Sequence, residues 1–319
     1  MASEFELIQK YFQSTDLPDD VTLGVGDDAA LLNMPEGHQL VVTVDTLIEG
    51  VHFPVNTTPE DIGHKALAVN LSDLAAMGAS PRWVTLALSL PSADESWVAE
   101  FARGFMALAN KHGVSLVGGD TTRGPLSITV QAMGWVNNAM SLLRSAASEG
   151  DDIYVSGTIG DAGLALQMLS GQGTIPDALL KALHRPEPRI ELGMALNGVA
   201  NASIDVSDGL IADLGHILEA SGVGAELSLE AMPYSSDVEQ WLGAGNDATL
   251  PLTWGDDYEL LFTASPEQAS AIQALSARLG LSLTRIGKIT EQPGLRIFTA
   301  EGEITNVAAT GYDHFGTHA

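Results

Sequence analysis

The 319-residue sequence contains no cysteine, few basic residues and no long apolar run. The absence of cysteine excludes thiolate nucleophiles, cysteine-type zinc sites and disulfides, so a bound metal would have oxygen ligands. No segment reaches the ~18 uninterrupted apolar residues that a membrane span needs. The N-terminal "MASEFELIQKYF" carries charges that do not suit a signal peptide. We therefore expect a cytoplasmic protein.

Acidic residues outnumber basic ones by 41 to 14, which gives a formal net charge of −27. Such a surface repels a nucleic-acid backbone or an anionic membrane, so neither is expected as a partner. Scattered surface acids are explained by solubility. Acids that cluster in the sequence need a separate explanation.

The chain is longer than the size at which one hydrophobic core usually stops growing. Its composition, 45% hydrophobic and 17% charged, is typical of a globular α/β protein. We expect two domains, residues 1–145 and 146–319. In the first, apolar and β-branched runs predict strands at 39–47, 82–90, 114–122 and 126–136.

Two helices are expected between these strands. Thr58 and Pro59 form an N-cap followed by a proline at the first helical position, and the helix runs through "EDIGHKALAVNLSDLAAMGA". The second helix is predicted to begin with a capping box at Ser92 and Glu95 and to end at Gly113. In the second domain we expect a helix after "SIDVSDG", a strand in "GDDYELLFTA", a helix after "TASP", and strands in "LTRIGKIT" and "GLRIFTA".

The segment "GVGDDA", residues 24–29, formally matches the dinucleotide fingerprint G-x-G-x-x-A. That interpretation fails because Pro35 and Gly37 interrupt the chain where a crossover helix should follow. In addition, Asp27 and Asp28 would face the pyrophosphate that the loop should attract. The two adjacent carboxylates need another explanation.

Further acids lie in apolar surroundings. Asp45 is expected at the end of the strand "LVVTVD", where a charge must reach solvent or find a partner. Asp73 lies within the apolar helix "ALAVNLSDLAAMGA", three residues after Asn70 and on the same face. A carboxylate in that position is costly unless something neutralises it.

Asp120 closes "SLVGGD", and Asp205 and Asp208 lie in "IDVSDG" before a helix. Each acid also has a plain structural explanation: Asp208 could be a helix N-cap, and the others could be hydrogen-bonding groups. Taken together, five or six acids at strand ends and helix starts, in a chain without cysteine, indicate a site for several Mg²⁺ ions and a polyphosphate. Asp27 and Asp28 would then tolerate each other because cations lie beside them.

Phosphate recognition also needs donors, and the sequence has no P-loop motif. Metal ions would therefore carry most of the phosphate neutralisation. Arg123 and Arg144, each beside an expected loop, are the candidate basic contacts, although a surface role explains either of them equally well.

Seven motifs in order along the chain resemble the thiamine-monophosphate kinase family, which belongs to a superfamily with aminoimidazole ribonucleotide synthetase and selenophosphate synthetase. They are "GVGDDAAL", "TVDTLIEGVHF", "KALAVNLSDLAAMGASP", "LVGGDTTRGPLSIT", "IDVSDGL", "GDDYELLFT" and "GYDHF". The resemblance implies ATP-dependent phosphorylation of thiamine monophosphate with several Mg²⁺ ions. It implies a two-domain α/β fold of the α+β type. The N-terminal mixed sheet, with helices on one face, would pair in a homodimer and bind metal and nucleotide, and the C-terminal α/β domain would complete the active site.

The resemblance also assigns candidate roles to residues. The metal shell would comprise Asp28, Thr43, Val44, Asp45, Asp73, Asp120, Asp205 and Asp208. The nucleotide contacts would be Gly119, Asp120, Arg144 and Ser207. The catalytic set would be Asp28, Asp73, Asp120, Arg144 and Asp208. The substrate contacts would be His52, Asp256 and Tyr312. Asp256 departs from the family pattern, because relatives often have glutamate in the motif that reads "GDDY" here.

The acceptor, a phosphate monoester, is largely dianionic at neutral pH, so it needs no general base. We therefore expect direct in-line transfer without a phosphoenzyme. Selenophosphate synthetase and the related hydrogenase maturation factor generally rely on cysteine or selenocysteine, which argues against both. The remaining alternatives are a sister synthetase resembling aminoimidazole ribonucleotide synthetase and a non-catalytic protein that binds nucleotide or divalent ions.

Overall fold

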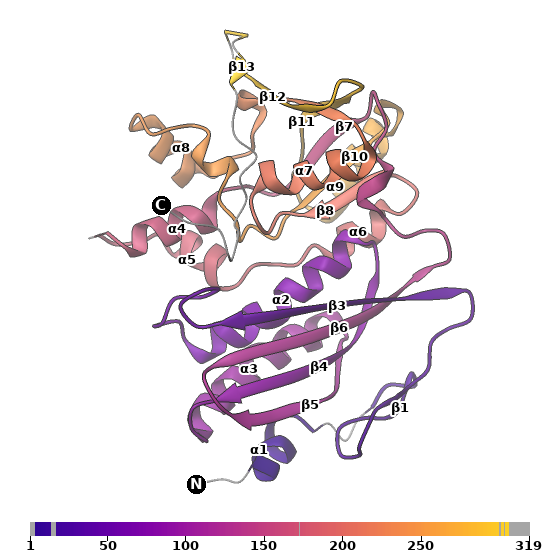
Figure 1. The fold of residues 1–319 in the computed structure, drawn as a ribbon, viewed down its shortest axis with the longest axis vertical. Helices are drawn as coiled ribbons and strands as arrows, with labels where there is room; N and C mark the ends of the chain where they lie inside the picture. Colours follow the sequence, from indigo (N-terminus) through magenta and orange to yellow (C-terminus); the bar gives the residue numbers. More distant parts are fainter. Residues whose placement is uncertain (1–3, 14–16, 172, 300, 303, 306–319) are drawn as a thin grey trace. The chain divides into compact units, whose positions relative to one another are not determined.

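Figure 1 shows the fold in a computed structural model, which describes residues 4–13, 17–171, 173–299, 301, 302, 304 and 305. The chain forms two compact units. Unit 1 comprises Met1–Leu74 and Ala79–Ala139, and unit 2 comprises Ala75–Gly78 and Met140–Ala319. Among the described residues, no helix has both the length and the apolar character needed to cross a membrane.

Unit 1 is built on a four-stranded mixed sheet with the order β3-β6-β4-β5, in which only β4 and β5 run parallel. The long helices α2 and α3 lie on one face of this sheet (Figure 1). The elements of unit 1, with the last two residues of α2 in unit 2, are α1 (Glu4–Tyr11), β1 (Val21–Leu23), β2 (Leu31–Leu32), β3 (His38–Ile48), α2 (Pro59–Ala76), β4 (Ser80–Leu90), α3 (Glu95–His112), β5 (Ser115–Arg123) and β6 (Ser127–Asn137). The four strands and two helices expected from the sequence are thus confirmed.

The helix ends follow from local hydrogen bonding, and one expected cap is wrong. The Thr58 hydroxyl accepts a bond from the Asp61 N–H at 3.2 Å, as its predicted capping role requires. At α3 the cap is Asp94 rather than Ser92, because the Asp94 carboxylate accepts from the N–H groups of Ser96 and Trp97. The helix ends at Gly113, whose φ of 64° is left-handed.

Side chains along β3 alternate between the two faces of the sheet. Thr43, Asp45 and Leu47 face the helices and are at most partly exposed, whereas Val42 and Val44 on the opposite face are 48% and 57% exposed. We call that opposite side of the sheet the open face. The hairpin of β1 and β2 covers one end of it, where Val21 packs on Trp83 and Val117.

Unit 2 contains a seven-stranded mixed sheet with the order β13-β12-β9-β11-β7-β10-β8, in which β9 and β12 are parallel. Its strands are β7 (Asp152–Ser156), β8 (Ala202–Asp205), β9 (Gly224–Ser228), β10 (Leu260–Ala264), β11 (Leu283–Thr290), β12 (Gly294–Phe298) and β13 (Ile304–Thr305). Its helices are α4 (Asp161–Leu169), α5 (Asp177–His184), α6 (Ile190–Leu196), α7 (Leu210–Ser221), α8 (Ser236–Gly243) and α9 (Ala269–Leu279). Short 3-10 turns are η1 (Arg144–Ala146), η2 (Leu229–Ala231), η3 (Leu250–Leu252) and η4 (Pro266–Gln268).

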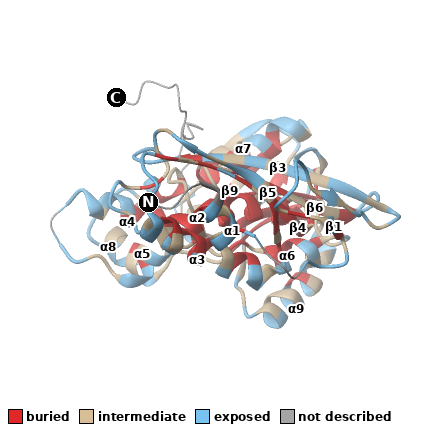
Figure 2. Cartoon of the chain, turned by 90° about the horizontal axis from the view of Figure 1, so that it is seen from below, coloured by how far each residue is buried: buried red, intermediate tan, exposed pale blue. Residues whose placement is uncertain are grey.

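Burial follows the layers within each unit (Figure 2). In unit 1, α2 is buried almost all round, with Leu67, Leu71 and Leu74 fully inaccessible. In unit 2 the main core lies between α7 and the sheet, where Ile211 and Leu214 pack with strand residues such as Ile204. The expected fold class, mixed α/β with helices on one face of the N-terminal sheet, is confirmed.

Two glycines allow α2 and α3 to approach closely. A Cβ at Gly63 would lie 2.1 Å from the Phe101 carbonyl oxygen, and one at Gly104 would lie 1.9 Å from the Glu60 carbonyl oxygen. Each helix therefore presents a glycine to the backbone of the other. No other residue fits there without moving a helix.

We predict that Gly104→Ala lowers the free energy of unfolding by about 1–3 kcal/mol, because the added methyl group forces the helices apart. Gly215→Ala is the matched control: Gly215 lies within α7, and a Cβ there would have no heavy atom within 4 Å. The control should leave stability unchanged or raise it by up to about 1 kcal/mol. Denaturant unfolding measures both, and equal stabilities of the two variants would contradict the packing argument.

Candidate active site

Three of the predicted metal ligands come together between β3 and α2. The Thr43 hydroxyl donates a hydrogen bond to the Asp73 carboxylate. One helical turn earlier, the Asn70 side-chain oxygen accepts from the Asp45 N–H at 3.1 Å, and its amide donates to the Ala66 carbonyl at 3.1 Å. Asn70 and Asp73 of α2 therefore both form hydrogen bonds with β3.

Asp45 and Asp120 lie within strands rather than at strand ends, which corrects the sequence-based expectation. β3 continues to Ile48, and β5 continues to Arg123. Asp120 pairs with Ala87, and Ala87 with Thr129, whose hydroxyl bonds to that of Thr46 on the open face. Paired residues point to the same side, so Asp120 lies on the open face and Asp45 on the helix-covered face.

A small cavity lies beside Asp120 in unit 1. Its lining combines Gly118, Gly119, Asp120 and Thr121 with the apolar side chains of Ile8, Phe12, Val25, Leu86 and Leu116.

Val25 belongs to the segment that carries Asp27 and Asp28. The two acids are exposed, and the Asp28 N–H donates to the Asp27 carboxylate at 2.8 Å. Because β2 follows this segment, the rejection of a dinucleotide fingerprint is confirmed.

The other predicted residues of unit 1 are more scattered. His52 follows β3, and its Nδ1 accepts from the Ile48 N–H at 2.9 Å, which fixes the ring orientation. The Val44 side chain is 57% exposed on the open face. Because this side chain has no ligand atom, only the backbone carbonyl of Val44 could bind a metal.

In unit 2 the turn between β8 and α7 carries Asp205, Ser207 and Asp208. Asp205, the last residue of β8, is 3% exposed. Asp208 is not the helix N-cap: that position is Gly209, which offers no side chain. The N–H groups of Ser207 and Asp208 instead both donate to Oδ2 of Asp213, each at 3.0 Å.

Burial raises the pKa of Asp213 to about 7, and the negative charge of Asp208 adds to the increase. The two backbone N–H groups and the positive charge of Arg144 act in the opposite direction. Arg144 begins the short turn η1, and its carbonyl accepts from the Ser221 hydroxyl at 2.8 Å. Both predicted nucleotide contacts therefore act on Asp213. The Ser207 N–H donates a hydrogen bond to it, and the charge of Arg144 lowers its pKa.

The "GDDY" segment is strained and anchored at both ends. Asp256 and Tyr258 have positive φ values of 70° and 49° although neither is glycine. The Asp256 N–H donates to the Ser207 carbonyl at 2.9 Å, and the Tyr258 N–H donates to the Val206 carbonyl at 2.8 Å. The Tyr258 hydroxyl donates to the Asp256 carboxylate at 2.9 Å. The predicted substrate contact Asp256 is thus held by its own segment and by the Ser207 turn.

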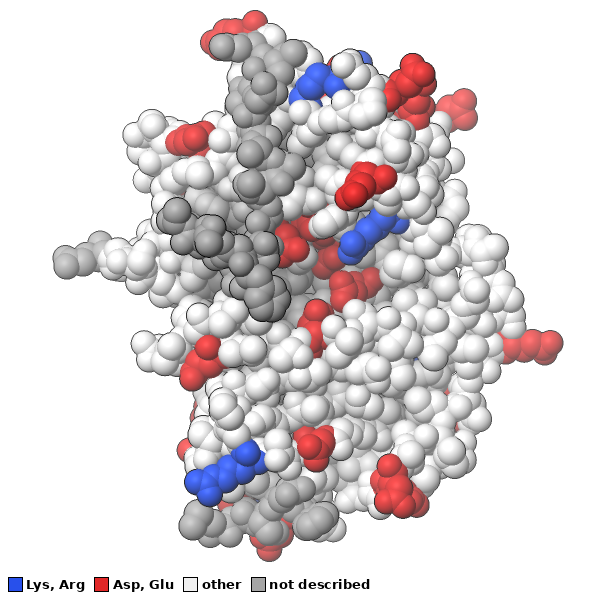
Figure 3. All heavy atoms as spheres, in the orientation of Figure 1, with Lys and Arg blue, Asp and Glu red and all other residues white. Residues whose placement is uncertain are grey.

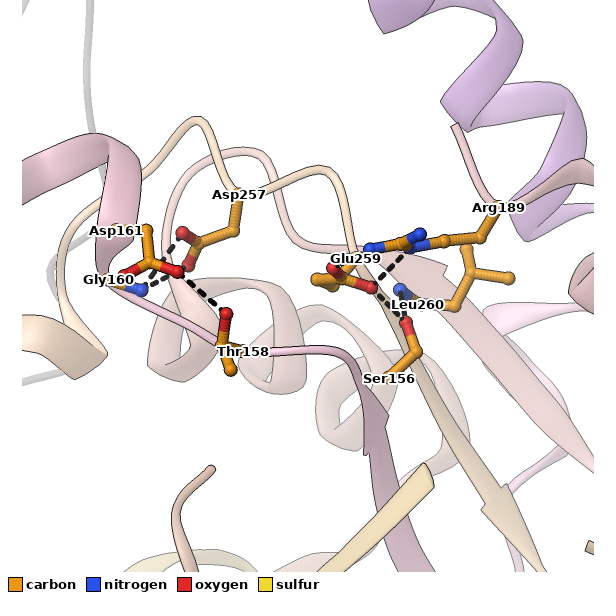
Figure 4. Close-up of polar contacts among 8 residues, drawn as sticks. All are labelled: Ser156, Thr158, Gly160, Asp161, Arg189, Asp257, Glu259 and Leu260. Atoms are coloured by element: carbon orange, nitrogen blue, oxygen red, sulfur yellow. Dashed lines mark hydrogen bonds and ion pairs between the residues drawn. The ribbon is translucent and has the colours of Figure 1, made fainter. Parts of the chain in front are cut away.

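Two carboxylates that sequence analysis missed, the half-buried Asp257 within this segment and the buried Glu259 just after it, anchor it to neighbouring parts of unit 2 (Figure 4). Asp257 accepts the Gly160 N–H with both oxygens, at 2.9 and 3.0 Å. Desolvation raises its pKa well above the ordinary value, and the charges of Asp161 and Glu259 add to this effect. The Glu259 carboxylate, whose residue is 5% exposed, forms a two-point ion pair with Arg189.

Ser156 completes this anchor. Its hydroxyl donates to Glu259 and accepts from the Leu260 N–H at 2.9 Å, as Figure 4 shows. The polar groups around Glu259 are therefore satisfied although the residue is buried. In the sequence, Asp257 and Glu259 were visible only as part of the "GDDYELLFT" motif. Nothing in that motif indicated their partners Gly160, Arg189 and Ser156.

The predicted residues in the described part of the chain belong to two sets, one in unit 1 around Thr43 and Asp73 and one in unit 2 around Asp205 and Asp208. Among the described residues, no three His, Asp or Glu side chains converge on one point in a way that could hold a metal ion. Tyr312 lies outside the described residues. Figure 3 shows that acids outnumber basic side chains over the face in view, in line with the net charge of −27.

The chain matches family models over most of its length: "AIR synthase related protein, N-terminal domain" over residues 26–136 and "AIR synthase related protein, C-terminal domain" over residues 148–299. Thiamine-monophosphate kinase of Haemophilus influenzae is 46% identical to it over 320 residues, which cover 98% of each chain. The chain belongs to the thiamine-monophosphate kinase family. The resemblance drawn from the seven motifs is thereby confirmed.

Solved structures agree with this membership of the thiamine-monophosphate kinase family. The crystal structure of thiamine-monophosphate kinase from Stenotrophomonas maltophilia K279a is 50% identical, with a TM-score of 0.84 over 90% of this chain and 93% of that one. The structure of AaThiL complexed with AMPPCP and TMP is 33% identical, with a TM-score of 0.77 over 91% and 92%.

The raised pKa of Asp213 predicts how the stability of the metal-free protein depends on pH. The folded-state value is about 7, against 3.8 for the ordinary side chain. The folded chain therefore binds this proton more tightly, so the stabilisation is fully present below about pH 4 and is lost as the pH rises through about 7. We predict that metal-free wild type loses up to about 4 kcal/mol more than Asp213→Asn between about pH 4 and 8.

Urea unfolding at a series of pH values, with a chelator present, measures this difference. Comparing the two proteins cancels the other titrating groups, Asp257 included. An identical pH dependence in both would show that Asp213 does not titrate in this range.

Proposed function

We propose that the chain transfers the γ-phosphoryl group of ATP to thiamine monophosphate, giving thiamine diphosphate and ADP. The observation that carries this proposal is the near-full-length similarity to thiamine-monophosphate kinases, one of which is described in complex with AMPPCP and TMP. The cytoplasm, where ATP is available, is the proposed location.

The proposed reaction is an in-line transfer between two anions. The acceptor phosphate is a competent nucleophile without a base, so the protein mainly has to align the reactants and neutralise their charge. The candidate residues present hard oxygen donors, carboxylates and hydroxyls such as the Asp73–Thr43 pair, which fit Mg²⁺. Mg²⁺ held by these residues would supply positive charge that offsets the negative charge of the phosphates.

The chain's own residues would have distinct roles. Asp73 and Asp45 would hold metal on the helix-covered face of β3, and Asp205 and Asp208 would do so at the β8–α7 turn. Arg144 would contact the phosphates directly. The sister-synthetase alternative would use the same acids with a different acceptor.

We propose separate binding surfaces for the nucleotide base and for the thiamine. The cavity beside Asp120 has apolar walls from Ile8, Phe12 and Leu86 next to the backbone of Gly119, and such walls suit a purine base. His52 and Asp256 would contact the thiamine. We propose that residues 1–145 supply metal and nucleotide binding and that residues 146–319 supply the remaining catalytic groups.

We further propose that the protein is a homodimer paired through the open face. Four apolar residues there, Leu40, Val42, Val44 and Ile48, are between 43% and 57% exposed on one strand. Monomeric proteins rarely leave such a contiguous apolar strip in water. A second copy covering the strip would remove it from solvent.

The positions of Asp45 and Asp120 support a shared site in such a dimer. They lie on β3 and β5, the two edge strands of the sheet, with two strands between them. Three interstrand spacings amount to about 14 Å, too far for both acids of one chain to bind the same ion. If two sheets close around a twofold axis, β5 of one copy lies along β3 of the other. Asp120 would then act in the site of the second copy.

The test of the function is ADP release from ATP and Mg²⁺ with thiamine monophosphate, free thiamine and aminoimidazole ribonucleotide precursors compared as acceptors. We expect stoichiometric thiamine diphosphate with thiamine monophosphate alone. Turnover with the aminoimidazole precursor would favour the sister synthetase. Mg²⁺-dependent nucleotide binding without turnover on any acceptor would favour the non-catalytic alternative.

The shared site is tested by mixing two variants. Asp73→Asn and Asp120→Asn should each be nearly inactive alone, since each removes one charge from the ion site. After subunit exchange, a mixed dimer has one site with both changes and one intact site. An equal mixture should therefore recover about a quarter of wild-type activity. If both acids serve the site of their own chain, the mixture stays inactive, and wild-type sedimentation as a monomer would also reject the dimer.

A further inference from the structure

The turn that carries Ser207 and Asp208 has no capping side chain of the usual kind. Gly209 occupies the N-cap of α7 with a φ of 110°, and a Cβ there would lie 2.8 Å from the Thr253 backbone. A serine, threonine or aspartate cap is thereby excluded at that position. The N–H groups that precede the helix need an acceptor from elsewhere.

Asp213 supplies that acceptor from inside the helix. It lies one turn into α7, its residue is 2% exposed, and its Oδ2 accepts the N–H groups of both Ser207 and Asp208 at 3.0 Å. Its own N–H donates to the Gly209 carbonyl at 3.0 Å, so the side chain is fixed at its base by regular helix geometry. One carboxylate oxygen therefore sets the direction of two consecutive peptide groups.

The opposite side of the turn is held as well. The Ser207 carbonyl accepts from the Asp256 N–H at 2.9 Å, and the Val206 carbonyl accepts from the Tyr258 N–H at 2.8 Å. The 255–258 segment thus holds the carbonyl groups and Asp213 holds the N–H groups. Without Asp213, the N–H groups of Ser207 and Asp208 would lose this acceptor.

A carboxylate is an expensive choice for a purely structural acceptor. Burial and the nearby Asp208 both disfavour its charge, with Arg144 as the nearby cation. A neutral acceptor would satisfy the same N–H groups at lower cost. What the carboxylate adds is a strong acceptor that reaches two donors at once, next to residues that have to present charge in a fixed direction.

We propose that Asp213 is a positioning residue, which fixes the Ser207–Asp208 turn so that the Ser207 hydroxyl and the Asp208 carboxylate meet the triphosphate and its Mg²⁺ ions in one orientation. This inference rests on the proposed function for the identity of the ligand. It goes beyond that function because it gives Asp213 a role through its hydrogen bonds to the turn and not through contact with the ligand. Supporting groups of this kind typically affect metal affinity 10–100-fold.

Three variants of the full-length protein test the inference. Asp213→Ala removes the acceptor, whereas Asp213→Asn keeps an oxygen in the same place. Asp151→Ala is the matched control: Asp151 is a 3% exposed aspartate in the same unit that accepts the Ser148 N–H at 3.0 Å, and it bonds to Asn201 and Thr263 rather than to the turn. Its loss should cost comparable stability without touching the turn.

The first measurement is hydrogen exchange at the Ser207 and Asp208 amides in the nucleotide-free protein, by NMR. Asp213→Ala should raise their exchange rates about tenfold or more, and the other two variants should leave them near the wild-type rates. The second is calorimetric titration of Mg²⁺ and AMPPCP. Asp213→Ala should weaken binding about 10–100-fold, and Asp213→Asn should stay within about threefold of wild type.

Unchanged amide exchange in Asp213→Ala, or a loss of affinity equal to that of Asp151→Ala, would overturn the inference. Should Asp213→Ala fail to fold, Asp213→Asn still decides: wild-type exchange together with a tenfold or greater loss of affinity would show that charge, and not the hydrogen bonds, is what matters. Neither measurement needs turnover. An inactive wild type would therefore refute the proposed function while leaving the exchange result valid.

Discussion

Closely placed carboxylates in a chain with few cations are the constraint on which the rest of this structure depends. With 41 acids and 14 basic residues, most acids cannot have a lysine or arginine partner. Some acids do pair with a basic residue in a structural role, as Glu259 does with Arg189. Several acids of the candidate site also accept hydrogen bonds from neutral donors: a hydroxyl for Asp73 and backbone N–H groups for Asp213 and Asp257. For Asp213 and Asp257 the backbone N–H groups only partly offset the desolvation that raises the pKa of each carboxyl.

This reliance on neutral donors shapes the backbone. N–H groups can serve a carboxylate only where a turn aims them away from regular helix and strand bonding. Around the site such turns carry unusual conformations: Gly160 at φ 85°, Gly209 at φ 110°, and the non-glycine residues Asp256 and Tyr258 in the left-handed region. In Asp256 and Tyr258, which are not glycine, this conformation costs about 1–3 kcal/mol each, and the surrounding hydrogen bonds have to offset that cost. The hydrogen bonds around Glu259 and Asp213 do so.

Sequence reasoning predicted the long elements and missed the support behind the site, and there is a physical reason for the difference. Periodicity over eleven residues fixes β3 and β6, and caps fix α2, because these signals are local. Asp45 and Asp120 were expected at strand ends because each closes an apolar run, but the strand continues past each of them, and neither residue is buried. Asp213, Glu259 and Arg189 were missed because each acts on a residue that is distant in sequence or hidden in an ordinary helical pattern. These partners meet only in the tertiary structure, so residue spacing in the sequence does not predict their contacts.

The Gly-Gly-Asp of β5 shows how a motif and a fold explain each other. The pairing of β4 with β5 skips one residue between Leu116 and Gly118, so that Val117 is an extra residue in the strand. Because side chains alternate along a strand, this bulge turns every later residue to the other face. Without it Asp120 would point at the helices; with it Asp120 reaches the open face. Gly119 is required by the same bend, since its φ is 150° and a Cβ would lie 1.9 Å from the Leu86 carbonyl oxygen. Asp120 is exposed on that face, so its charge is solvated there and accessible to a cation. The motif thus places an exposed carboxylate on the open face, the surface through which the proposed homodimer would pair.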